Sequence, residues 1–287
     1  MSLQSILGIA IPIITFFLMT IVGMDLTSDD FKKIRNTPKA FWVGTFGQYL
    51  LPFCAWMVLL LLRPVPEVAS GMILIASAPA GGISNYYSYL ARVNVALSVV
   101  LTTVSCICAA ITMPLLLQLF QFLLPQSTSY YVPLKILFKH LMSLLVIPIM
   151  IGFAVRLFFP TFLPKYGKIL KYAGFIALGI LIGFIFYQTW AAFVLTWRNI
   201  LITATVFIVF SMLLGYILGL MFRLDKKNSF TLLIEYGTRN VAITTATAVI
   251  VLQRTEYATF AAIYFLAEAL IILPTIAIFK RKNSPQK

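Results

Sequence analysis

Nine apolar segments, each about 20 residues long, follow one another along this chain with only short polar connections between them. They lie roughly at 5–24, 40–62, 68–90, 95–124, 134–158, 169–188, 199–222, 230–252 and 259–279. Helices of this length cross the ~30 Å hydrocarbon core of a bilayer. With 61% hydrophobic and 10% charged residues, the composition excludes an ordinary soluble globule. The sequence therefore predicts an all-α polytopic membrane protein with nine transmembrane helices, in which residues 1–287 form a single transmembrane domain.

The basic residues are distributed unevenly between the two sets of alternate loops. Sixteen Lys and Arg residues lie on one set together with the C-terminal tail, against five on the other set. Because short cytoplasmic loops are enriched in Lys and Arg, the C-terminus is predicted to be cytoplasmic and the N-terminus outside, in the plasma (inner) membrane. The net charge of +14 is then a topology signal, with membrane lipid as a secondary partner and no nucleic acid.

Two of the apolar segments are interrupted by polar, glycine-containing stretches at 79–85 and 235–240. Hydrocarbon cannot satisfy the free backbone groups of a broken helix, so such a break must lie within protein or line a watery cavity. In secondary transporters, one break in each half of the chain marks the place where substrate and ion bind. The sequence is therefore interpreted as that of a transporter.

The positions of the two breaks also predict an internal symmetry. They fall in the third and eighth segments, so segments one to four would correspond to segments six to nine. The first and sixth segments would cross the membrane in opposite directions, which makes the repeats inverted.

The few ionisable residues within the apolar segments are candidates for function. Glu235 and Arg239 are four residues apart and are expected to pair on one helix face, either as a functional pair or as a structural one. Glu268 and His140 are further ionisable residues, and no role is assigned to them.

Several neutral oxygen-bearing side chains accompany Glu235. Ser98 and Thr102 are four residues apart, so their hydroxyls face the same way on a helix. With Ser84, Asn85 and Glu235 they would offer neutral oxygens and one carboxylate to a hard monovalent cation such as Na⁺. The alternative is that these hydroxyls only bond backbone carbonyls or neighbouring helices.

Three segments of the sequence resemble one family of membrane transporters. The segment GGISNYYSYLARVNVALS at 81–98 resembles the hallmark segment of the bile acid:sodium symporter family, approximately GGTASNxxTYLAxGNxALS. The segment MDLTSDDF at 24–31 is similar to the family's MGLxLxxxDF, and EYGTRN at 235–240 is similar to its ExGxQN. The resemblance covers essentially the whole chain.

The resemblance implies a fold of two parts, with two crossed broken helices in a core domain and a panel domain beside it. By similarity the core would cover 40–124 and 199–279, and the panel 5–24 and 134–188. The family's first sodium site uses the residues that match Ser84, Asn85, Ser98, Thr102 and Glu235.

At the positions of the family's second sodium site, this chain differs from the family's pattern. Arg239 stands where the motif has glutamine. A second family glutamine is matched by Gly47, because Gln48 is out of register by one residue. A guanidinium beside Glu235 would satisfy that carboxylate itself, so Arg239 is interpreted as a built-in substitute for the second sodium.

Together these patterns predict sodium-coupled symport of an organic anion, either bile-acid-like or a smaller carboxylate, by alternating access. Asn85, Arg239 and Asn240 are the predicted substrate contacts, and Na⁺ is the coupling ion with no other cofactor. The alternatives are a proton-coupled carrier using Glu235 or Glu268, an uncoupled carrier, and a transporter-derived ligand sensor. An enzyme is not expected, since the chain has neither G-x-S-x-G nor H-E-x-x-H. Substrate identity and oligomeric state stay open.

Overall fold

The computed structural model describes the backbone of residues 3–35, 37–124 and 133–283. Residues 1–2, 36, 125–132 and 284–287 lie outside this description. The predicted sides of the membrane for the N-terminus and the C-terminus therefore concern residues that are not described. The described residues form a succession of helices: α1 (Leu3–Asp25), α2 (Ser28–Arg35), α3 (Pro38–Gly47), the 3₁₀ turn η1 (Gln48–Leu50), α4 (Leu51–Leu62), α5 (Pro66–Ser77), α6 (Ile83–Ala91), α7 (Val95–Leu123), α8 (Leu134–Leu141), the π-helical turn η2 (Met142–Val146), α9 (Ile147–Phe158), α10 (Phe162–Met221), α11 (Lys226–Gly237), α12 (Val241–Ala246), the π-helical turn η3 (Thr247–Val251) and α13 (Thr255–Asn283).

Seven helical stretches of the described chain are long and apolar enough to cross a membrane. They are Gly8–Asp25, Pro38–Leu62, Val95–Leu123, Leu134–Phe158, Lys165–Ala191, Phe193–Met221 and Thr255–Lys282. The protein is therefore an all-α, multi-pass membrane protein. The other two apolar segments, 68–90 and 230–252, are each divided into two short helices, as the polar interruptions predict. The count of nine transmembrane helices and the inverted repeat stay predictions.

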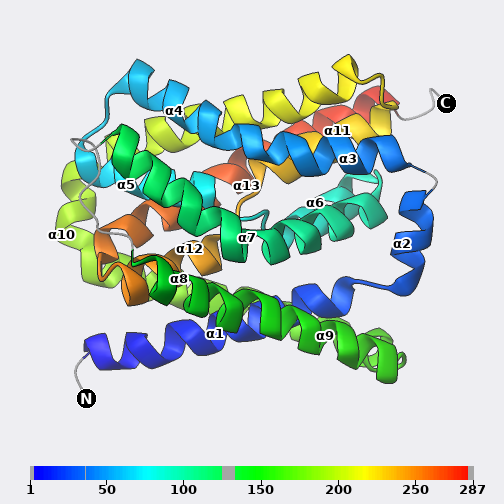
Figure 1. Ribbon diagram of the computed structural model, residues 1–287, viewed down its shortest axis with the longest axis horizontal. Helices are drawn as coiled ribbons and strands as arrows, with labels where there is room; N and C mark the ends of the chain where they lie inside the picture. The colour runs from blue at the N-terminus through cyan, green and yellow to red at the C-terminus, as the bar shows by residue number, and fades with distance from the viewer. Residues whose placement is uncertain (1–2, 36, 125–132, 284–287) are drawn as a thin grey trace.

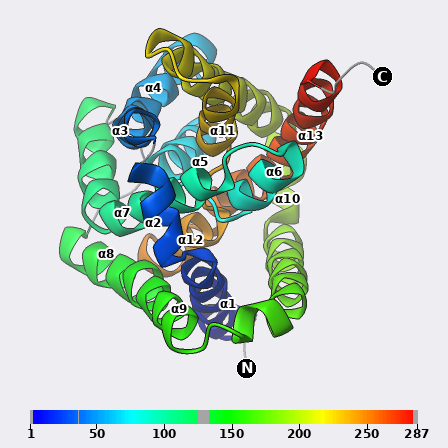
Figure 2. The same ribbon diagram turned by 90° about the vertical axis from the view of Figure 1, so that its right-hand side faces the viewer.

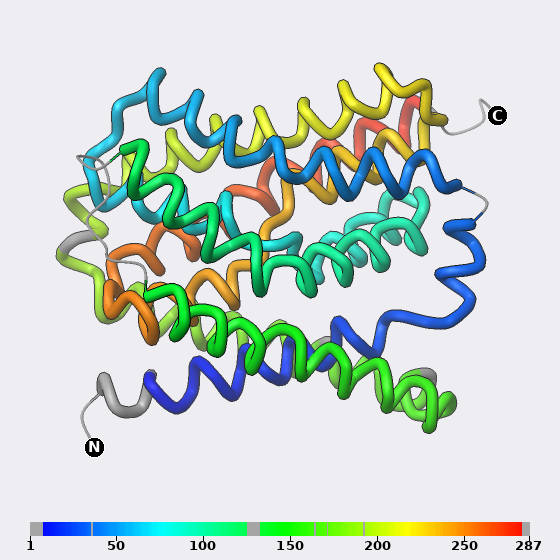
Figure 3. The backbone as a smooth tube through the Cα atoms, in the orientation of Figure 1, coloured from blue at the N-terminus to red at the C-terminus, as the bar shows by residue number. Residues whose placement is uncertain are grey.

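Most of the long helices run along the length of the molecule, whereas the short α2 stands across it (Figure 1). The end-on view places α1, α8 and α9 together at one side, whereas α3, α4 and α11 lie at the other (Figure 2). The chain of α10 joins the two sides: it turns at the left of Figure 3, and its second half, in yellow, returns along the top. The side formed by α1, α8 and α9 packs on the rest of the molecule through α1, which contacts α10 and α12, and through α8, which contacts α7.

The two breaks meet near the middle of the molecule (Figure 1). The Gly81 N–H donates to the Thr238 carbonyl at 3.2 Å, and the Asn240 N–H donates to the Pro79 carbonyl at 2.9 Å. Ala80 and Arg239 stand opposite each other in this short antiparallel pair. Backbone groups that the breaks remove from helices are thus satisfied by each other, as membrane depth requires.

Local sequence explains where each break begins and ends. Ala78 is extended, with ψ of 156°, because the residue before a proline is disfavoured in helical conformation. On the other break, the Asn240 side chain accepts the Ile243 N–H at 3.1 Å and so caps the start of α12. Gly81 is required by close approach: a Cβ there would lie 2.6 Å from the Arg239 carbonyl oxygen. The breaks are therefore specified by proline, a cap residue and a missing side chain.

Candidate ion and substrate site

Glu235 lies in the last turn of α11 and is completely buried. Its Oε1 accepts a hydrogen bond from the Thr102 hydroxyl at 2.6 Å, and its Oε2 accepts one from the Ser98 hydroxyl at 2.8 Å. Both hydroxyls come from one face of α7, which confirms the orientation predicted from their spacing. Hydrogen bonds to an ionised group are about twice as strong as neutral ones, so this pair of donors holds the carboxylate in place.

Ser84 and Asn85, in the first turn of α6, complete the cluster. The Ser84 hydroxyl lies 3.1 Å from that of Thr102, and Asn85 Oδ1 accepts from the Ser98 hydroxyl at 3.1 Å. The five predicted ion-site residues therefore form a single buried group, which we call the oxygen cluster. Its composition, three hydroxyls, an amide oxygen and a carboxylate, suits a hard monovalent cation rather than a transition metal. Whether it binds Na⁺ stays a prediction.

Arg239 lies between α11 and α12 and is also buried, with 4% of its surface exposed. Its Nη2 donates to the Ala78 carbonyl and, at 3.4 Å, to the Ala76 carbonyl, at the C-terminal end of α5. No ion pair joins it to Glu235 within the described chain, so the expected pairing on one helix face is wrong. The physical reason is that α11 ends at Gly237, and the extended Thr238 takes Arg239 out of the helical register.

Gln48 lies at the start of η1 and is buried. Together with Ser77 and Arg239 it lines a small cavity of about 30 Å³. Gly47 instead packs against the Tyr236 hydroxyl, which donates to the Gly44 carbonyl at 3.0 Å. Gln48, rather than the Gly47 that matches the family's glutamine, thus lines the same cavity as Arg239. The 3₁₀ turn that begins at Gln48 changes the register of side chains along this segment.

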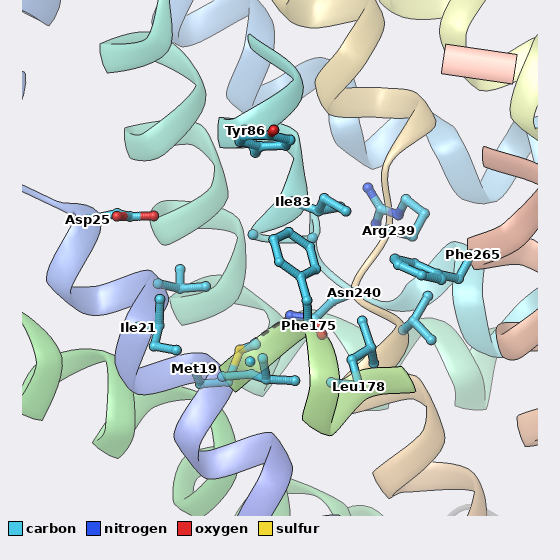
Figure 4. Close-up of a pocket in the computed structure, with 17 residues that line it drawn as sticks. Met19, Ile21, Asp25, Ile83, Tyr86, Phe175, Leu178, Arg239, Asn240 and Phe265 are labelled. Carbon is cyan, nitrogen blue, oxygen red and sulfur yellow. Dashed lines mark hydrogen bonds between the residues drawn. The ribbon is translucent and has the colours of Figure 1, made fainter. Parts of the chain in front are cut away.

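A second cavity, of about 120 Å³, opens between the breaks and helices α1 and α10 (Figure 4). Its walls are mostly apolar, and Arg239 and Asn240 line it from the second break. Of the predicted substrate contacts, Asn85 does not line this cavity, because its side chain belongs to the oxygen cluster. Asp25 and Arg239 lie on opposite sides of the cavity in Figure 4. We call this space the central cavity.

The sequence matches the family model described as Sodium Bile acid symporter family over residues 12–196. That match covers more than half of the chain. The chain belongs to this family. The matched range includes α6 and α7, which supply four residues of the oxygen cluster, and it ends before Glu235 and Arg239.

Individual members of the family are similar over much of the chain. The probable chloroplastic sodium/metabolite cotransporter BASS1 of Arabidopsis thaliana is 28% identical over 222 residues, which are 76% of this chain and 54% of that protein. The uncharacterized sodium-dependent transporter YocS of Bacillus subtilis is 36% identical over 151 residues, 51% of this chain and 45% of that protein. The human hepatic sodium/bile acid cotransporter is 26% identical over 243 residues, 83% of this chain and 68% of that protein. The chain thus spans about half the length of the first two relatives.

Some residues of this family member's central cavity were not singled out by sequence reasoning. Met19 accepts the Asn240 side-chain N–H on its sulfur at 3.3 Å, and Phe175 and Leu178 line the cavity from α10. These side chains sit within uniformly apolar segments, so no local pattern separates them from lipid-facing neighbours. Their role depends on α10 lying beside the breaks, which only the tertiary structure shows.

Proposed function

We propose that the protein is a secondary active transporter that couples inward movement of Na⁺ to symport of an organic anion. One observation carries this proposal. The same pair of helix breaks places a buried carboxylate among neutral oxygens on α6 and α7, and a guanidinium beside the central cavity. A cation site and a candidate anion site are thereby fixed to one structural element, which is the arrangement that coupled transport requires.

Na⁺ is the ion that fits the oxygen cluster best. Glu235 supplies one negative charge, and the remaining ligands, from Ser84, Asn85, Ser98 and Thr102, are neutral oxygens. One charge and several oxygens replace the hydration shell of a monovalent cation without the stronger field that a divalent ion demands. The names of the relatives, which describe sodium-dependent or sodium/metabolite transport, support the same ion.

The central cavity supports an amphipathic carboxylate as substrate. Its apolar walls come from α1 and α10, and Arg239 and Asn240 offer donors from the second break. A bile acid or a smaller carboxylate has both an apolar body and an anionic group. Alternating access would then be movement of a core, 40–124 and 199–279, against a panel, 5–24 and 134–188. The proposed setting is the plasma membrane with the N-terminus outside and the C-terminus in the cytoplasm.

Arg239 supports a stoichiometry of one Na⁺ in each cycle. Its guanidinium donates hydrogen bonds to the Ala76 and Ala78 carbonyls, which carry the partial negative charge of the C-terminal end of α5. Those carbonyls would otherwise be available to a second cation. The guanidinium substitutes for that cation through backbone oxygens, rather than through Glu235 as its spacing suggested.

Flux into liposomes tests the proposal against its alternatives. The purified chain is reconstituted, and uptake of labelled cholate and of short-chain carboxylates is measured with Na⁺ outside or with choline in its place. We expect uptake that requires Na⁺ and is lost in Glu235→Gln. Uptake that is unchanged in choline would overturn sodium coupling and favour a proton-coupled or uncoupled carrier. Binding without flux would identify a ligand sensor.

A further inference from the structure

Glu268 is a second buried carboxyl group, on α13, that the proposed transport mechanism leaves unused. It is completely buried, and among the described residues no side chain donates a hydrogen bond to either of its carboxyl oxygens. Glu235, in contrast, accepts hydrogen bonds from Ser98 and Thr102. These two are the fully buried acidic side chains of the described chain, and their surroundings differ in kind.

The group that faces Glu268 is Arg239. In the antiparallel pair of the breaks, the hydrogen bonds join Gly81 to Thr238 and Asn240 to Pro79, so the Arg239 backbone N–H points away from the paired segment. That N–H and the guanidinium charge both act on the Glu268 carboxyl. The other titratable groups of the described chain that interact with it are Tyr87 on α6 and Tyr264 on α13. Tyr264 donates its own hydroxyl to the Gly237 carbonyl at 2.8 Å.

The Arg239 guanidinium is itself only partly satisfied. Nη2 bonds the carbonyls at the end of α5, whereas Nε and Nη1 have no partner among the described residues. A buried carboxyl that no side chain bonds and a buried guanidinium with two unpaired nitrogens are complementary groups on neighbouring elements. An ionised carboxylate without partners is strongly disfavoured at this depth, whereas a neutral carboxyl is tolerated.

We propose that Glu268 is a proton-binding site, distinct from the oxygen cluster, whose proton decides which anionic group Arg239 serves. With the proton on Glu268, Arg239 stays on the α5 carbonyls and its charge is available to an anion in the central cavity. When Glu268 releases the proton to water, its carboxylate draws the guanidinium to itself. The guanidinium keeps its own protons throughout, so ionisation of Glu268 releases one proton to water for each protein molecule.

The sign of the pH effect follows from this competition. A rise in pH ionises Glu268, removes Arg239 from the central cavity and weakens anion binding there. The hydrogen bonds of the oxygen cluster involve neither Arg239 nor Glu268, so we expect Na⁺ binding to continue. The proton site is inferred from the positions of Glu268 and Arg239 alone. Its effect on transport, in contrast, rests on the proposed function.

Infrared difference spectroscopy on the full chain in lipid nanodiscs tests the proton site directly. Spectra are recorded across a pH titration for the parent, Glu268→Gln, Glu235→Gln and Glu256→Gln. Glu256 is the matched control, because it lies on the same helix but is partly exposed and within 3.5 Å of Arg254. We expect a protonated-carboxyl band at neutral pH that weakens as pH rises, and a component of it that is lost in Glu268→Gln and survives in the other two variants.

Two results would overturn the proposal: a parent protein without a protonated-carboxyl band at neutral pH, or a band of undiminished intensity in Glu268→Gln. If Glu268→Gln does not fold, Glu235→Gln decides, since Glu268 is then the remaining fully buried acid of the described chain. A thermal-shift titration with Na⁺ runs in parallel, and Glu268→Gln is expected to keep the parent's shift. Absence of any Na⁺ shift in the parent would count against the proposed sodium coupling while leaving the proton site standing.

Discussion

Replacing Thr102 by Val tests the oxygen cluster most sharply, because the neighbouring residue provides a matched control. Thr102 donates to Glu235 at 2.6 Å, whereas Thr103 donates to the Val99 carbonyl of its own helix at 2.8 Å. Both are buried on α7, and each substitution removes one hydroxyl while keeping the branched shape. Only Thr102→Val removes a group from the oxygen cluster.

The size of the effect follows from the hydrogen bond that is lost. A hydrogen bond to a charged group contributes about 1.5–3 kcal/mol, so Thr102→Val should destabilise the Na⁺-free protein by about that much. Loss of a Na⁺ ligand worth ~1.4 kcal/mol weakens binding tenfold. At a Na⁺ concentration a hundred times the parent's dissociation constant, the parent gains ~2.7 kcal/mol of stability, and the variant then gains only ~1.4 kcal/mol.

The assay is thermal unfolding of the detergent-solubilised protein across a Na⁺ series, with choline keeping the ionic strength constant. We expect the Na⁺ response of Thr102→Val to move to about tenfold higher concentration, and that of Thr103→Val to match the parent. If the two variants respond to Na⁺ alike, the hydroxyl of Thr102 is only structural and the reasoning fails.

Three other substitutions test separate parts of the site. Gly81→Ala should disrupt the pairing of the breaks and lower the free energy of unfolding by about 1–3 kcal/mol, because its Cβ would meet the Arg239 carbonyl. Gly179→Ala is the control in the same unfolding assay, because a Cβ there would meet no atom of another part of the chain within 4 Å. Arg239→Gln should raise the Hill coefficient of Na⁺-dependent uptake above the parent's value near one by freeing the Ala78 carbonyl, whereas Arg239→Lys should not; a cooperative parent contradicts this. Tyr264→Phe should lower thermal stability by about 0.5–1.5 kcal/mol through loss of the bond to Gly237, and an altered Na⁺ midpoint would show that this hydroxyl serves the ion instead.

Sequence reasoning succeeded where a single helix or a composition rule determines the result. Ser98 and Thr102 face the same way because helical periodicity fixes the direction of side chains four residues apart. The two breaks follow from polar, glycine-containing stretches within apolar segments, which cannot continue as lipid-facing helix. The resemblance to the family then joined α6, α7 and α11 into one predicted cluster, and the structure brings those residues together.

The predictions that failed depend on where a helix stops. The spacing of Glu235 and Arg239 indicates a pair only if the helix continues between them, and α11 ends at Gly237. The sequence puts Gln48 one residue out of register with the family's glutamine, but the 3₁₀ turn η1 begins at Gln48 and alters the register of side chains there. The lining of the central cavity by Phe175 depends on the fold of α10, for which the apolar sequence contains no local signal.

The charges buried around the two breaks suggest why ion and substrate would move together. When Glu268 is protonated and Glu235 is ionised, the site without ligands holds one negative and one positive side chain, Glu235 and Arg239, and both are buried. Na⁺ alone leaves one excess positive charge, and an anion alone leaves one excess negative charge. Uncompensated charge at membrane depth is costly, so the half-loaded forms are disfavoured during reorientation. The empty form and the form with both ligands are the balanced ones.

On the proposed function, this balance predicts that transport of a monovalent anion with one Na⁺ is electrically neutral. Uptake of the monoanion cholate by proteoliposomes should therefore be the same whether a K⁺ gradient with valinomycin sets the interior negative, positive or at zero potential. Arg239→Gln removes the fixed positive charge, so a second Na⁺ is needed for balance and uptake should become faster with a negative interior. Potential-dependent uptake by the parent would show that more than one Na⁺ accompanies each anion. In that case Arg239 serves the substrate without replacing a cation.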